Sequence, residues 1–109
     1  MTDVVPETRG PLSGPTGRRV ASRIGEVRAL LQRHGVSNAR VFGSVARGDD
    51  REGSDLDLLV DFAPGTTLFD LVGIQMELEE LLGIDVDLVP ENGLKPRMRS
   101  RVERDLVPL

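Results

Sequence analysis

Two short stretches of the chain alternate aspartate with aliphatic residues and could form a metal site. They read SDLDLLVD and IDVDLV. This period of two is typical of a β-strand, in which residues i and i+2 share a face about 6.6 Å apart. Asp55 and Asp57 should therefore point the same way, as should Asp85 and Asp87. On a helix the members of each pair would lie about 200° apart and could not share a ligand.

If the two strands are neighbours, three or four carboxylates converge. Two carboxylates about 4 Å apart repel by roughly 4 kcal/mol at an effective dielectric of about 20, so a cation is expected between them. Oxygen ligands select hard cations, Mg²⁺ or Mn²⁺, and two such ions about 3.5–4 Å apart suit phosphoryl or nucleotidyl transfer. The alternative is that the aspartates are solvated and protect a strand edge. Aspartate is, however, a poor strand former that recurs here at four positions.

The Gly43-Ser44 pair precedes the first aspartate strand and could bind a phosphate. Glycine allows a close approach of the backbone to an anion, and the serine hydroxyl with free N–H groups at a helix start would hold it. Arg47, one turn later, could reach a phosphate oxygen. The alternatives are an ordinary turn with a capping serine, and an Arg47 that is solvent-exposed or paired with Asp49 or Asp50.

The hydrophobic pattern predicts the elements that position these residues. Apolar residues recur at helical spacing over 18–34, before Gly35, and again over 68–82. Pro96 suits the start of a last helix that ends before Pro108. Strands are expected at Asn38–Phe42, Ser54–Asp61 and Ile84–Val89, with a helical turn at Val45–Arg47. The expected fold class is α+β, with one small sheet covered by helices mainly on one face and the aspartate face open to solvent.

Composition limits the domain count and the chemistry. The 109 residues suffice for one domain, expected over 18–109, and the proline and glycine residues of 1–17 predict a flexible N-terminal arm. The absence of cysteine excludes thiolate catalysis and zinc–thiolate sites, and His34, the single histidine, is expected to be exposed. Aromatic residues are 3% and the net charge is -4, so direct nucleic-acid binding is not expected. No apolar run approaches the roughly 20 residues of a membrane span, and the expected location is cytoplasmic.

Three segments together resemble the polymerase-β-type nucleotidyltransferase superfamily, and more narrowly its minimal nucleotidyltransferase branch. The segments are GSVARG at 43–48, SDLDLLV at 54–60 and VDLV at 86–89. The resemblance extends from about Arg18 to the end of the chain. It implies a small mixed β-sheet packed by helices, similar to the polymerase-β palm, and a two-metal transfer from a nucleoside triphosphate.

The resemblance also implies a role for each motif residue. The pair at 43–44 would hold the phosphates of the nucleotide. Asp55 and Asp57 would bind two Mg²⁺ ions, with Mn²⁺ as the alternative metal. Asp87 matches the third carboxylate, which assists in activating the attacking hydroxyl. Asp85 is not part of the pattern and is counted as a neighbour.

Members of this branch often pair with HEPN-type proteins in toxin–antitoxin modules. The leading hypothesis is therefore an antitoxin that transfers AMP from ATP to a tyrosine hydroxyl of a cognate HEPN ribonuclease toxin. It rests on a complete motif in a chain of 109 residues, which leaves little room for an acceptor-binding domain. Two alternatives are an antitoxin that neutralises its toxin by complex formation alone, and a small-molecule nucleotidyltransferase.

Overall fold

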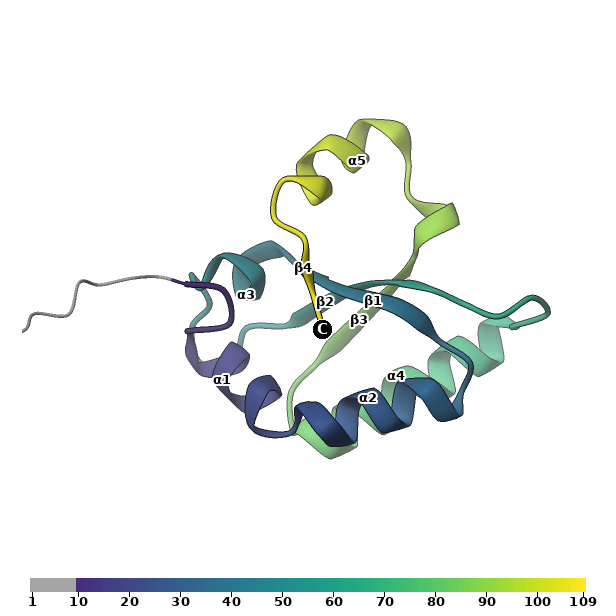
Figure 1. The fold of residues 1–109 in the computed structure, drawn as a ribbon, viewed down its shortest axis with the longest axis horizontal. Coiled ribbons are helices and arrows are strands. Elements are labelled where there is room, and N and C mark those ends of the chain that lie inside the picture. Colours follow the sequence, from purple (N-terminus) through teal and green to yellow (C-terminus); the bar gives the residue numbers. More distant parts are fainter. Residues whose placement is uncertain (1–9) are drawn as a thin grey trace, which may run out of the picture.

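A four-stranded mixed sheet forms the centre of the structure, a computed structural model that describes residues 10–109. The spatial order is β3-β2-β1-β4 (Figure 1). β1 is antiparallel to β2 and to β4, whereas β2 and β3 are parallel. The expected α+β class with a mixed sheet is confirmed. The strands are β1 (Ser37–Phe42), β2 (Leu56–Asp61), β3 (Val86–Pro90) and β4 (Val107–Pro108).

Helices cover both faces of this sheet, and α2 and α4 lie along one of them (Figure 1). α4 begins with a capping box, in which the Thr67 hydroxyl accepts from the Asp70 N–H and the Asp70 carboxylate accepts from the Thr67 N–H. It ends at Gly83, which has a φ of +70°. The helices within 10–109 are α1 (Pro15–Ser22), α2 (Ile24–Arg33), α3 (Gly43–Arg47), α4 (Leu68–Leu82), the 3-10 turn η1 (Glu91–Gly93) and α5 (Pro96–Glu103).

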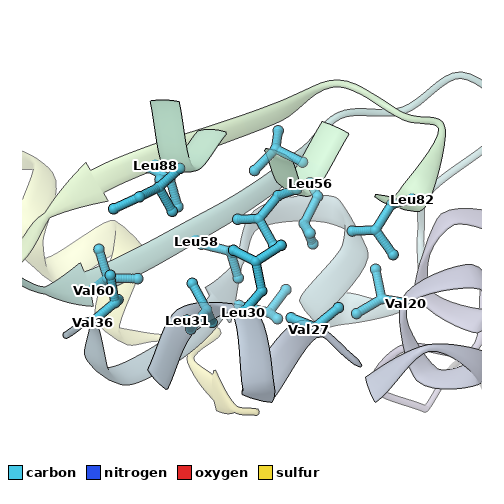
Figure 2. Close-up of a cluster of buried hydrophobic side chains, with 14 of the residues drawn as sticks. Val20, Val27, Leu30, Leu31, Val36, Leu56, Leu58, Val60, Leu82 and Leu88 are labelled. Carbon is cyan, nitrogen blue, oxygen red and sulfur yellow. The ribbon is translucent and has the colours of Figure 1, made fainter. Parts of the chain in front are cut away.

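The main core lies between the sheet and the α2–α4 layer. Alternate residues of β2 point into it, and Figure 2 shows them facing the apolar side chains of the helices. Full burial of one such aliphatic side chain contributes about 1.5–3 kcal/mol. Most of the buried apolar side chains of the sheet therefore lie on this face. The labelled members of the core are Val20, Val27, Leu30, Leu31, Val36, Leu56, Leu58, Val60, Leu82 and Leu88.

The opposite face carries the aspartates and is only partly open. Leu59 of β2 is fully buried there in a second cluster with Leu94 and Val102. Phe42 and Val89 pack against this cluster. The expectation of a solvent-open aspartate face is thus wrong for the half that α5 covers. The covering residues are brought in by the chain after β3, which the pattern of the strands alone does not reveal.

β4 was not indicated by the sequence, which suggested a helix end at Pro108. Val107 and Pro108 instead pair with Val41 and Arg40 of β1, and the Leu109 N–H donates to the Ala39 carbonyl at 3.0 Å. A strand of two residues has no period to detect. No helix in the described part of the chain has the length and apolar character needed to cross a membrane.

The single helix expected over 18–34 is two helices, separated at Arg23. This residue has φ -121° and ψ 23°, and its N–H donates to the Val20 carbonyl. The apolar periodicity runs through the break without interruption, because Val20 and Val27 are both fully buried. α1 begins at Pro15, three residues before the expected domain boundary, with Thr16 buried. Residues 1–9 of the expected arm lie outside the described residues.

Residues 12–17, called here the N-terminal strap, bind the connector at 48–54 that joins α3 to β2. The anchor is Asp50, whose buried carboxylate accepts from the N–H of Thr16 at 2.6 Å and of Gly17 at 3.2 Å. Asp50 therefore caps the start of α1 from a distant part of the chain. Further bonds run from Leu12 N–H to the Val45 carbonyl at 3.2 Å and from the Thr16 hydroxyl to the Ser54 carbonyl at 3.3 Å.

We expect Asp50→Ala to lower the free energy of unfolding by about 2 kcal/mol, because two buried N–H groups would lose a charged acceptor. Asp49→Ala is the matched control, since its carboxylate is exposed and pairs with Arg47 at the surface. It should cost less than about 1 kcal/mol. Urea unfolding of both variants gives the comparison, and equal losses would contradict the capping role of Asp50.

Candidate active site

The parallel pairing of β2 with β3 places two of the predicted carboxylates side by side. Asp57 and Asp87 are direct partners in the ladder, so their side chains emerge on the same face. On the other side of β2, Phe42 is the partner of Asp57, and Gly43 follows it. Asp55 lies exposed just before β2 begins. Asp57 thus occupies the middle of the site, with Asp87 on one side and the predicted phosphate loop, Gly43-Ser44, on the other.

The charge of Asp57 is unfavourable in this position. Partial burial, followed by repulsion from Asp87 and then from Asp55, raises the pKa of Asp57 to about 6. Asp87 and Asp55 therefore both act on Asp57. Asp85 makes no contribution of this kind to Asp57 and lies just before β3, which agrees with its treatment as a neighbour.

Gly43 approaches Asp57 more closely than any other residue type would allow. Its φ is +77°, a left-handed conformation, and a Cβ atom built on it would lie 2.7 Å from the Asp57 Oδ2 atom. Ser44 comes next in α3 and is partly buried. The glycine at this position therefore serves the contact between the phosphate loop and the central carboxylate. Of the glycine–serine pair predicted from the sequence, Gly43 lies directly beside the Asp57 carboxylate.

Arg47 is not free in this structure. Its Nε atom donates to Asp49 and its Nη1 atom to Asp105, both at 3.1 Å. The pairing with Asp49 was one of the alternatives left open by the sequence, whereas Asp105 comes from the residues after α5. These two hydrogen bonds raise the pKa of Arg47 further above its usual value. Arg47 therefore connects α3 to the end of α5.

The donor set suits a hard divalent cation that is completed by substrate. No group of three or more metal-ligating side chains is gathered among residues 10–109. Mg²⁺ is usually held by one or two carboxylates together with substrate phosphates and water, so a full protein cage is not required. The repulsion that raises the pKa of Asp57 is what a cation between Asp57 and Asp87 would relieve. Asp57 and Asp87 fit such an ion only as partial ligands, completed by substrate phosphates and water.

Two cavities lie in the structure without any of the three predicted carboxylates in their walls. One, about 580 Å³, surrounds the loop between β2 and α4 and contains none of the predicted residues. A second, about 360 Å³, is bordered by Gly43 and Arg47 on one side and by Arg101 and Arg104 on the other. The sequence analysis did not assign these two arginines to the site. Their spacing along α5 gives a basic helix face, but the contact with the phosphate loop depends on the fold.

Known proteins with similar sequences are nucleotidyltransferases. The nucleotidyltransferase domain family matches residues 25–109. A relative from Methanocaldococcus jannaschii, provisionally named a protein adenylyltransferase, is 44% identical over 72% of this chain and 84% of its own length. The protein adenylyltransferase MntA of Thermococcus cleftensis is 42% identical over 72% of this chain and 79% of its own.

Solved structures give the same fold. One that is provisionally described as a minimal nucleotidyltransferase is 46% identical, covers 96% of this chain and 100% of its own, and superposes with a TM-score of 0.76. A toxin–antitoxin structure with AMP-PNP is 22% identical, covers 77% of this chain and 69% of its own, and gives a TM-score of 0.68, a likeness of fold alone. The chain therefore belongs to the nucleotidyltransferase domain family. Within that family it is a minimal nucleotidyltransferase.

We expect Gly43→Ala to abolish nucleotidyl transfer. A methyl group at this position would displace the Asp57 carboxylate, in addition to the cost of about 1–2 kcal/mol of a left-handed alanine. Gly65→Ala is the matched control, because Gly65 has a φ of +87° and open space around it. Both variants should lose similar stability in urea unfolding, but only Gly43→Ala should lose activity. Equal activities of the two variants would contradict the role of Gly43.

We expect Asp57→Asn to stabilise the metal-free protein above pH 6. The pKa of Asp57 is raised from 3.8 to about 6 on folding, so the charged carboxylate opposes folding at neutral pH. The penalty decreases as the pH falls through 6, because the folded protein then takes up a proton. Solvent screening of this partly exposed group limits the gain to about 1 kcal/mol.

Urea unfolding in the presence of a chelator, at about pH 7.5 and about pH 4.5, measures this gain. Asp85→Asn is the control, since its exposed carboxylate lies outside β3 and does not act on Asp57. A stability difference between Asp57→Asn and wild type that does not change with pH would contradict the assignment.

Proposed function

We propose that this chain is a cytoplasmic, Mg²⁺-dependent protein adenylyltransferase that acts as an antitoxin. It transfers AMP from ATP to a tyrosine hydroxyl of a cognate HEPN ribonuclease toxin. The observation that carries the proposal is the position of Asp57 between Asp87 and Gly43. The names of the relatives that are 44% and 42% identical support AMP as the transferred group and a protein as its acceptor.

The glycine–serine pair and the three carboxylates each have a place in this reaction. Gly43 and Ser44 hold the phosphates of ATP beside the carboxylates. Asp55, Asp57 and Asp87 hold two Mg²⁺ ions, which when bound stabilise charge on the attacking and leaving oxygens. Because β3 is an edge strand and Asp87 is exposed, an acceptor hydroxyl can approach this carboxylate from solvent.

Transfer of AMP begins when the acceptor hydroxyl lies beside Asp87. Asp87 assists in removing the proton of the tyrosine hydroxyl, whose oxygen forms a bond to the α-phosphorus of ATP. The bond from this phosphorus to the oxygen that bridges to the β-phosphorus breaks, and pyrophosphate leaves. The tyrosine then carries AMP through a phosphodiester bond. No protein nucleophile is required, which is consistent with a sequence that has no cysteine.

A second function, neutralisation by complex formation, is favoured by one observation. Large apolar side chains are exposed along one side of α4: Leu68 (74%), Phe69 (90%), Val72 (43%) and Met76 (61%). Contiguous apolar surface of this kind is typical of protein–protein contact. A toxin bound there could be inhibited without catalysis, so binding and catalysis must be separated by variants.

The test is incubation of this chain with ATP, Mg²⁺ and its toxin, followed by intact-mass measurement of the toxin. We expect a gain of one AMP, lost on addition of a chelator and in Asp57→Asn, and retained in Asp85→Asn. No gain with active toxin would contradict adenylyl transfer. If Asp57→Asn still neutralised the toxin in cells as well as wild type, complex formation would be sufficient.

A further inference from the structure

The cavity of about 360 Å³ beside Gly43 has the size of a small-molecule site and is lined by cations. It lies between α3 and α5, next to the phosphate loop. Its walls combine charged groups with the apolar side chains of Phe42, Met98 and Val102. Four charged groups border the same space: Arg47, Arg101, Arg104 and Asp105.

These charges are not equivalent. Arg47 is paired with Asp49 and Asp105 at 3.1 Å, so its charge is already compensated. Within residues 10–109, the side chains of Arg101 and Arg104 are exposed and have no hydrogen-bonding or ionic partner. The cavity therefore carries two uncompensated positive charges in a chain whose net charge is -4.

An anion is the ligand that such a cavity favours. A triphosphate placed at Gly43 carries several negative charges, and cations in the adjoining cavity would neutralise those that Mg²⁺ does not. Guanidinium groups form paired, charge-assisted hydrogen bonds with phosphate oxygens. We infer that Arg101 in α5 and Arg104 directly after it bind the phosphates of the nucleoside triphosphate, an inference that rests on the proposed function.

This assignment moves the phosphate-binding cation from Arg47 to α5. Arg47 is a positioning residue, because its bond to Asp105 fixes the end of α5 against α3. The arginines then face the phosphate loop across the cavity. Phe42, Met98 and Val102 give the rest of the ligand an apolar wall.

The test measures binding of ATP, with Mg²⁺, by calorimetry to wild type, to the double variant Arg101→Ala/Arg104→Ala and to Arg97→Ala. Arg97 is the matched control, because it is an exposed arginine of the same helix that does not border the cavity. We expect the double variant to weaken ATP binding at least tenfold, and Arg97→Ala to change it less than twofold. Inorganic tripolyphosphate with Mg²⁺ should lose affinity in parallel with ATP.

The outcomes separate the two proposals. Failure of wild type to bind ATP would overturn the proposed function together with this inference. ATP binding by wild type and double variant with equal affinity would overturn this inference alone. If ATP affinity were unchanged but transfer to the toxin fell, the arginines would contact the acceptor, and the assignment to phosphate would be wrong. Circular dichroism verifies that the variants are folded.

Discussion

The parallel pairing of β2 with β3 is the constraint on which the rest of the molecule depends. It sets Asp57 directly beside Asp87 and therefore creates a repulsion that nothing on the same face relieves. The opposite face of the same strands supplies the stabilisation, through Leu56, Leu58 and Leu88 in the main core. Parallel strands require a crossover, and α4 is that crossover. The capping box and the apolar inner side of α4 thus stabilise the strand pairing that brings the two carboxylates together, although α4 lies on the other face of the sheet.

The two faces of the sheet have different roles, and β2 contributes residues to both. Leu56 and Leu58 point into the core, whereas Asp57 and Leu59 point the other way. Leu59 fastens the α5 segment to the second face, next to the aspartate that needs to remain accessible. A buried core residue and a site carboxylate therefore lie close together on β2. The α5 segment completes the small core around Leu59 and also borders the cavity beside Gly43. It therefore limits the site on this side.

Period-two alternation was sufficient to predict that Asp57 and Asp87 lie on one face of the sheet, and Gly43 lies beside Asp57. What the sequence could not give are contacts between residues far apart along the chain. Arg47 meets Asp105 across 58 positions, and Asp50 meets Thr16 across 34. The break at Arg23 was hidden because the buried residues keep helical spacing through it. A local pattern reports which face a residue lies on, but not which segment will cover it.

The N-terminal strap affects how easily the connector at 48–54 can open. It binds the connector between Gly43 and the carboxylates mainly through the Asp50 carboxylate, which accepts from the N–H groups of Thr16 and Gly17. Its release removes few side chains from the main core, so we expect this local opening to require less free energy than global unfolding. Because the connector links Gly43 to Asp57, such an opening would separate the two halves of the site while the sheet stayed folded.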